Sequence, residues 1–140
     1  MTDRSCDFCE IVARRLPAAI LFEDELTMSF LDITAVTEGH TLVIPKSHCV
    51  DIWDVPEDGA VAVMRTAHRM AARIREVLAP EGLTLFQANR AVGWQDVFHL
   101  HLHLVPRWPD DRLTRPWTAA PAELRTLSRL RSRLALTERL

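Results

Sequence analysis

The stretch Phe98-His99-Leu100-His101-Leu102-His103-Leu104-Val105-Pro106 alternates histidine and leucine with a period of two residues. This period is typical of a β-strand, in which residues two apart point to the same face. We therefore expect three imidazoles in one row, about 6.6 Å apart at roughly 3.3 Å per residue. The leucines and Phe98 should form an apolar row on the other face. Pro106 lacks an N–H group, so it ends the strand or places it at a sheet edge.

Three histidines on one face bring together groups that can act as nucleophile, acid, base or metal ligand near neutral pH. Two chemistries fit the residues. Two imidazoles could hold a zinc ion that activates water, although the acidic residues that follow, Asp110 and Asp111, lie beyond two prolines. Alternatively, a neutral imidazole could attack phosphorus directly. In that case His101, flanked on both sides, is the geometric choice for the nucleophile.

Composition and charge exclude several classes of protein. With 140 residues, 48% hydrophobic and 26% charged, the chain fits one soluble globular domain. A net charge of −2 gives no basic field for nucleic acid. No apolar run approaches the roughly 20 residues of a membrane helix, and no signal-like stretch opens the chain. Three cysteines are too few for a disulfide framework, so we expect a cytoplasmic protein with no membrane and no nucleic-acid partner.

Hydrophobic patterns predict the remaining elements. Besides the histidine strand, we expect strands at 19–23, 27–31, 41–45 and 83–89. The 41–45 strand is almost wholly apolar and should be central. Helices are expected at 6–16, from Pro56 to the residues before Pro80, and from Pro121 onward. These elements do not alternate as βαβ units, so the fold class is α+β, with a five-stranded antiparallel sheet, one long helix, a short N-terminal helix and a C-terminal helix.

Two helices have apolar lines that predict how they pack. The C-terminal helix belongs to residues 109–140, which hold seven arginines and four acids, and it should pack on the same domain through its leucines. We expect Met64 and Met70 to fill core space and His68 to have no catalytic role. The apolar line of the long helix, with a period of 3.6, comprises Val61, Met64, Ala67, His68, Ala71, Ile74, Val77 and Leu78.

Several single residues remain ambiguous from the pattern alone. Cys6 and Cys9 form half of a zinc site, and two buried structural cysteines are an equal alternative. Asp32, at the end of a strand, could accept ribose hydroxyl protons or simply cap a turn. His48 follows a strand end, where functional groups are often delivered. The loop at 93–97 could bind an anion through its backbone N–H groups.

The segment 99–105, His-Leu-His-Leu-His-Leu-Val, resembles the signature of the histidine-triad family of nucleotide hydrolases and transferases. Other blocks resemble this family in its order and spacing, namely 8–12, 16–18, 22–24, 30–33, 39–48 and 95–98. The resemblance spans roughly residues 6–108, and we expect residues 1–108 to form the histidine-triad domain, with 109–140 as a C-terminal extension. It is similar to the small branch that hydrolyses nucleoside phosphoramidates and related adenylates.

The resemblance implies a five-stranded antiparallel sheet in each subunit of a homodimer. It implies His101 as the nucleophile that forms a nucleotidyl-histidine, His99 and His103 as helpers at the α-phosphate and leaving group, and His40 nearby. It also implies that Asp32 takes the ribose hydroxyls. The other nucleotide-binding residues that it implies are Phe8, Leu16, Phe30 and Ile33 around the base, and Asn89, Gln95, Asp96 and Val97 toward the phosphate.

Zinc-bearing members of this family imply one more assignment, a structural zinc with four ligands. These ligands are Cys6, Cys9, His48 and His99, a set suited to a closed tetrahedral site. Cys49 is then a bystander. This assignment gives His99 to the metal rather than to the reaction.

Two residues depart from the family pattern. Trp94 stands where the family commonly has glycine, so the loop either turns one residue early at Gly93 or carries the indole over the leaving-group side. Asp96 stands where some members have serine or threonine at the phosphate. A carboxylate there repels phosphate, so Asp96 either points away or only a neighbouring N–H group contributes.

The favoured function is therefore a nucleotide hydrolase or transferase. It would cleave at the α-phosphate of a purine nucleoside phosphoramidate, an adenylate or a dinucleoside polyphosphate, through an intermediate on His101. A metal-activated hydrolase and a non-catalytic nucleotide-binding dimer are the alternatives. No organic cofactor is expected.

Overall fold

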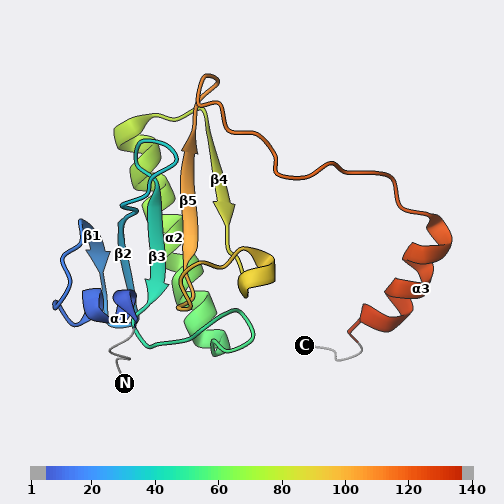
Figure 1. Ribbon diagram of the computed structural model, residues 1–140, viewed down its shortest axis with the longest axis horizontal. Helices are drawn as coiled ribbons and strands as arrows, with labels where there is room; N and C mark the ends of the chain where they lie inside the picture. The colour runs from blue at the N-terminus through green and yellow to red at the C-terminus, as the bar shows by residue number, and fades with distance from the viewer. Residues whose placement is uncertain (1–5, 137–140) are drawn as a thin grey trace.

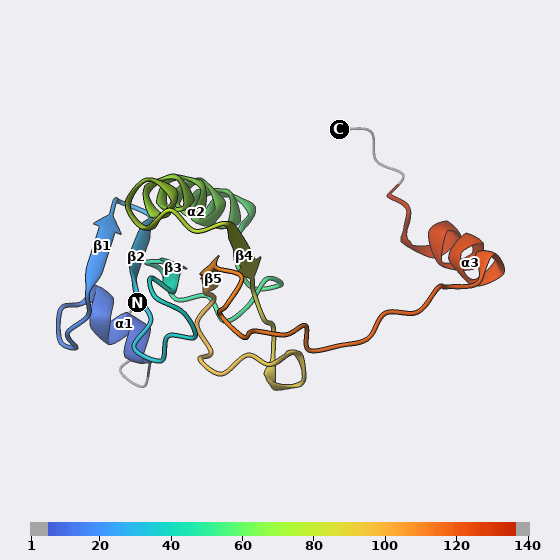
Figure 2. The same cartoon turned by 90° about the horizontal axis from the view of Figure 1, so that it is seen from above.

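A computed structural model describes residues 6–136 as one antiparallel sheet with helices on both sides. The strand order is β1-β2-β3-β5-β4. One sheet face carries the long helix α2, and α1 lies on the other side (Figures 1 and 2). The elements are α1 (Asp7–Val12), β1 (Ile20–Glu23), β2 (Thr27–Leu31), β3 (Thr41–Pro45), α2 (Glu57–Leu78), β4 (Gly82–Phe86), the 3₁₀ turn η1 (Ala91–Gly93), β5 (Leu102–Arg107) and α3 (Leu124–Leu134). The predicted α+β class is confirmed.

The two sheet faces support two separate apolar clusters because side chains alternate along each strand. On the α1 side, Phe8 and Ile11 pack with Phe30 and Leu42. On the α2 side, Val43 packs with residues of α2 and β5. All five residues of β3 are buried, so the prediction that 41–45 is a central strand is confirmed.

The predicted buried face of α2 is only partly right. Ala67 and Ile74 are buried as expected, but Val61 is 49% and Met64 is 54% exposed. The buried residues are Ala62, Val63, Thr66, Ala67, Met70 and Ile74. Small side chains in this stripe let the helix approach the sheet, and the hydroxyl oxygens of Thr66 and Thr27 lie 2.6 Å apart. Apolar residues occur around much of α2, so periodicity alone could not choose the face.

The histidine stretch is a strand only in its second half. β5 begins at Leu102, because the chain before it hydrogen-bonds outside the sheet ladder; for example, the N–H of Leu100 donates to the carbonyl of Cys49 at 2.7 Å. The three leucines of the stretch pack in the α2-side cluster as predicted. Phe98 does not join them and is 51% exposed. Alternation thus predicted the faces correctly but overestimated the length of the strand.

The C-terminal helix does not pack on the domain of its own chain. Both views show α3 at the end of an extended arm, away from the sheet (Figures 1 and 2). None of its residues is buried, and Leu124 is 84% exposed. Residues 114–123 of the arm contain Pro116 and Pro121 and form no helix or strand. The expectation that α3 packs on the same domain is wrong. Within residues 6–136, no helix is long and apolar enough to cross a bilayer.

The packing of α2 gives a matched test. Val63→Ala removes two methyl groups from a side chain that is 4% exposed, and we expect it to lower the free energy of unfolding by about 2 kcal/mol. Val77→Ala makes the same chemical change at a side chain that is 56% exposed and should cost less than about 0.5 kcal/mol. Urea unfolding of both variants measures the difference. Equal losses would contradict the observed helix orientation.

Candidate active site and metal centre

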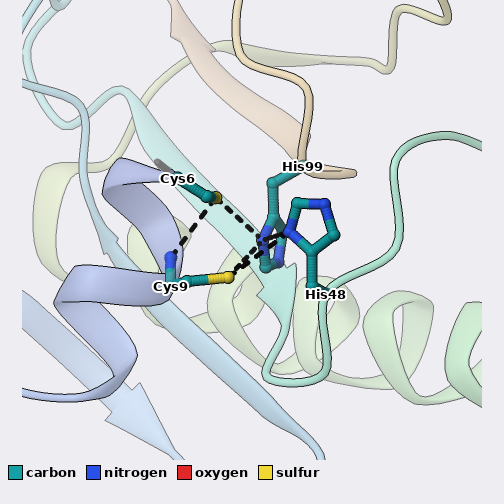
Figure 3. A group of neighbouring side chains, drawn as sticks. All are labelled: Cys6, Cys9, His48 and His99. Carbon is teal, nitrogen blue, oxygen red and sulfur yellow. Dashed lines mark hydrogen bonds between the residues drawn. The ribbon is translucent and has the colours of Figure 1, made fainter. Parts of the chain in front are cut away.

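Two cysteines and two histidines converge beside α1 (Figure 3). Cys6 caps α1, and its sulfur accepts a hydrogen bond from the N–H of Cys9. His48 follows β3, and His99 precedes β5. Nδ1 of His99 lies 3.4 Å from Sγ of Cys6 and 3.6 Å from Sγ of Cys9. Nδ1 of His48 lies 3.3 Å from Sγ of Cys9 and 3.2 Å from Nδ1 of His99.

These separations fit a tetrahedral zinc ion. With Zn–S bonds of about 2.3 Å and Zn–N bonds of about 2.0 Å, tetrahedral ligand atoms lie roughly 3.3–3.8 Å apart. His99 is also oriented for this role, because its Nε2–H donates to the carbonyl of Pro45 at 2.8 Å and leaves the Nδ1 lone pair facing the cysteines. Burial lowers the pKa of His99 to about 4, so the ring is neutral at pH 7. Cys49, the third cysteine, is outside this group.

A cavity of about 360 Å³ lies on the same side of the sheet as α1. One part of its wall is apolar and includes Phe8, Leu16, Phe30 and Ile33. The polar part includes Asp32, Asp96, His101 and His103, with Val97 beside them. The cavity therefore brings together most of the residues predicted for nucleotide binding and catalysis.

His101 presents one free nitrogen to this cavity. Its Nδ1–H donates to the carbonyl of His99 at 2.8 Å, so Nε2 is the nitrogen that carries the lone pair. Nε2 lies 3.4 Å from Oδ1 of Asp96. The ring of Phe8 contacts the His101 ring edge-on at 5.3 Å between centroids and limits its rotation. An imidazole fixed in this way is a nucleophile whose attacking atom is already aimed.

His40 and His103 form a directional hydrogen-bonded pair. Nδ1 of His40 accepts from the N–H of Val36 at 3.2 Å, so its Nε2–H donates to Nδ1 of His103 at 2.9 Å. The proton of His103 therefore lies on Nε2. Asp32 lies 3.5 Å from Nε2 of His40 and holds its own loop by accepting from Thr34. The pair does not need a metal ion, because each facing nitrogen already has a partner.

Burial keeps this histidine pair neutral. It lowers the pKa of His103 to about 4, helped by the charges of His101 and His40 and opposed by Asp32. Burial also lowers the pKa of His40, again against the carboxylate of Asp32. The ring of Phe86 stacks on His103 with centroids 4.0 Å apart. At neutral pH, His103 thus offers one N–H donor to a bound group.

The amides of Gln95 and Asn89, predicted to reach the phosphate, bind other parts of the protein in this structure. Gln95 is 4% exposed; its amide donates to the carbonyls of Val50 and Val97, and its oxygen accepts from the N–H of Arg90. Asn89 exchanges hydrogen bonds with Gln87 and accepts from the N–H of Ile52. Neither lines the cavity of this structure, and their contact with a bound phosphate stays a prediction. Both side chains shape the loop that carries Asp96.

His99 and Trp94 also differ from one of their expected roles. Both ring nitrogens of His99 are engaged away from the cavity, and the side chain is fully buried, so no nitrogen remains for the reaction. Trp94 does not line the cavity. Its indole stacks on Trp117 of the C-terminal arm, with centroids 5.6 Å apart. The loop does not turn one residue early at Gly93, because the left-handed conformation, which favours glycine, falls on Trp94 itself with a φ of 74°.

Some site partners could not be found from the sequence. The carbonyls of Pro45 and His99 and the N–H of Val36 select the tautomers, but any residue can supply these backbone groups. Phe86, which covers His103, looks like an ordinary strand residue. The one available signal was the strict two-residue spacing of the histidines.

The fold and the site together place the chain in a known class. The model of the HIT domain family matches residues 13–110, which include His101 and its neighbours, and the chain belongs to this family. Protein hit of Bacillus subtilis (strain 168) is 39% identical over 104 residues, covering 74% of this chain and 72% of that protein. Adenosine 5'-monophosphoramidase HNT1 of Saccharomyces cerevisiae is 31% identical over 133 residues, covering 94% and 82%.

Solved structures agree with the fold. A HIT family protein from Bacillus anthracis superposes with a TM-score of 0.88 at 33% identity and covers 96% of each chain. A zinc-bound histidine triad family protein from Mycobacterium smegmatis superposes with a TM-score of 0.75 at 36% identity, covering 92% of this chain and 97% of that one.

The neutral histidine pair predicts how stability depends on pH. In the unfolded chain, His103 titrates near its ordinary value of 6.5, whereas in the folded chain it titrates near 4. The unfolded state then binds more protons between these values, so the free energy of unfolding should fall as pH drops from about 6.5 to about 4. Between pH 7.5 and pH 5, the free energy of unfolding should therefore fall less in His103→Gln than in wild type.

The control for this experiment is His68→Gln, because His68 is exposed on α2. Urea unfolding, with a chelator in every sample, compares the three proteins in the same metal-free state. The control should behave like wild type. An identical acid loss in His103→Gln would contradict the neutral, buried state of His103.

Proposed function

We propose that the protein is a nucleotide hydrolase that transfers a purine nucleoside monophosphate to His101 and then to water. The observation that carries this proposal is the hydrogen bond from Nδ1–H of His101 to the carbonyl of His99. It leaves Nε2 unprotonated and facing the cavity, as attack on phosphorus requires. The name of the yeast relative, an adenosine monophosphoramidase, supports a phosphoramidate as the substrate.

The reaction follows from the positions of the two histidines. Nε2 of His101 attacks the α-phosphorus; the N–P bond forms as the bond from phosphorus to the leaving amine breaks. The amine takes up one proton from water at the open side of the cavity, while the Nε2–H of neutral His103 donates a hydrogen bond to the α-phosphate. Water then attacks the phosphorus, the N–P bond to His101 breaks, and the proton released by water returns to the solvent. AMP and a free amine are the products.

The nucleoside would occupy the apolar part of the cavity. Phe8 and Phe30 contact each other edge-on at 5.4 Å, and with Leu16 and Ile33 they offer a surface for a purine ring. Asp32 is 11% exposed in its side chain and is the acceptor for ribose hydroxyls. The N–H of Val97 donates to the side chain of Asp96 at 2.8 Å. If that side chain turned away, the same N–H would be available to a phosphate oxygen.

We also propose a structural zinc ion on Cys6, Cys9, His48 and His99. The ligand spacing and the fixed lone pair of His99 support it, as does the zinc-bound relative. The ion would link the start of α1 to two further segments, the one after β3 that carries His48 and the one before β5 that carries His99. Through the carbonyl of His99, this anchor also holds His101, so His99 acts as a positioning residue rather than a catalytic one.

We propose a homodimer in the cytoplasm, with residues 1–108 as the histidine-triad domain and 109–140 as an extension. Several apolar side chains are exposed to water in the single chain, and a second copy of the chain would cover them in a dimer. Val61 and Met64 on α2 are about half exposed, and so are Leu85 and Phe86 on the edge strand β4. The leucines of α3 are exposed as well.

Turnover of adenosine 5′-phosphoramidate tests the function. Wild type should release AMP, and His101→Ala should lower kcat by at least about a thousandfold because the attacking nitrogen is gone. AMP should still bind, since the purine and ribose contacts remain. His68→Ala changes an exposed position of α2 and should keep the wild-type rate. Full activity in His101→Ala would favour a metal-activated reaction, and AMP binding without turnover in wild type would favour a binding protein.

The metal content of purified variants tests the zinc site independently of activity. Wild type should carry one zinc ion per chain, whereas Cys9→Ser should lose it and show a Tm lower by about 5 °C or more. Cys49→Ser is the matched control, because Cys49 is buried but outside the ligand group. Retention of zinc in Cys9→Ser, or its loss in Cys49→Ser, would contradict the assigned ligand set.

A further inference from the structure

The charged side chains around the cavity are all acidic. Asp7, Asp32 and Asp96 line it, and within residues 6–136 no lysine or arginine does. His103 is neutral at pH 7, because burial lowers its pKa to about 4. Sites that transfer phosphoryl groups usually surround the phosphate with cations. Here a bound phosphate receives no cationic side chain from the described part of the cavity.

Of these three acids, Asp96 lies beside the reacting atom. Its Oδ1 is 3.4 Å from Nε2 of His101, and its side chain is 77% exposed. Asp32 is committed elsewhere, because its carboxylate accepts from Thr34 and faces the buried His40. The Oδ1 of Asp96 accepts from the N–H of Val97 at 2.8 Å, and the exposure of its side chain places it at the open rim of the cavity.

The two ends of a bound substrate would meet different surroundings. The nucleoside would fill the apolar part of the cavity, formed by residues such as Phe8 and Phe30. In-line attack by Nε2 of His101 directs the leaving group away from that nitrogen, so we expect it to extend toward the open side of the cavity, where the exposed carboxylate of Asp96 acts on it through space. An ionised carboxylate only accepts hydrogen bonds, so it favours an N–H or ammonium group and repels a carboxylate or a further phosphate.

We propose that Asp96 selects the leaving group by its charge. The preferred substrates are purine nucleoside phosphoramidates whose leaving group carries a second, positively charged amine, such as conjugates of diamines. Conjugates with an anionic leaving group, including polyphosphates, are disfavoured. This inference rests on the proposed hydrolysis at His101 and narrows its substrate class.

A matched pair of adenosine 5′-phosphoramidates tests the selection. One is made with ethylenediamine, which leaves a positive tail, and the other with β-alanine, which leaves a negative tail. Both contain the same nucleoside and the same phosphorus–nitrogen bond. For wild type at pH 7.5 and low salt, we expect kcat/KM to favour the positive tail on the order of tenfold, and added salt should reduce the ratio.

Substitution of Asp96 should remove the preference. In Asp96→Asn and Asp96→Ser the ratio should fall to within about threefold, because the neutral side chains exert no net Coulomb force. Asp110→Asn is the control: it removes an exposed acid outside the cavity and should keep the wild-type ratio. The ratio is internal to each protein, so a loss of overall activity does not affect it.

The outcomes separate the two proposals. If wild type cleaves both conjugates equally, or if Asp96→Asn keeps the full preference, the role of Asp96 is wrong while hydrolysis at His101 stands. If wild type cleaves neither these conjugates nor adenosine 5′-phosphoramidate, the proposed function itself fails, and the inference fails with it.

Discussion

Hydrogen bonds from imidazole rings to backbone groups are the constraint on which this site depends. His40, His99 and His101 each use one ring nitrogen to bind the main chain, which assigns the other nitrogen its proton and its direction, and His103 is set in turn by its hydrogen bond with His40. His99 donates to the carbonyl of Pro45, and His101 donates to the carbonyl of His99. His40 accepts from the N–H of Val36. Adjacent histidines of one segment thus receive opposite tautomers and different roles.

The sheet makes these hydrogen bonds possible by burying the opposite face. Leu100, Leu102 and Leu104 pack with α2, which fixes the segment so that its histidines face the α1 side. On that side, the Cys6–Cys9 pair meets His99, while Phe8 of the same helix contacts the rings of both His99 and His101. A short helix therefore connects the candidate metal centre to the candidate nucleophile.

Much of this arrangement was predictable, and the failures share a cause. Alternation gave the strands and the grouping of the histidines, and the family resemblance pointed to the Cys6–His99 group. The buried face of α2, the length of β5 and the position of α3 were not predictable, because several apolar faces compete and only packing in three dimensions decides. The loop hydrogen bonds of Gln95 and Asn89 were not predictable either, because an amide that supports a loop and one that binds phosphate look alike in a sequence.

The tautomers of the histidines are the most direct test of this account. Nitrogen-15 NMR of histidine-labelled protein at pH 7.5 reports which ring nitrogen carries the proton. We expect Nδ1–H for His101 and Nε2–H for His40, His99 and His103, with assignments made from single His→Gln variants. A His101 that carries its proton on Nε2 would contradict the central claim, since the nitrogen facing the cavity would then have no lone pair for attack on phosphorus.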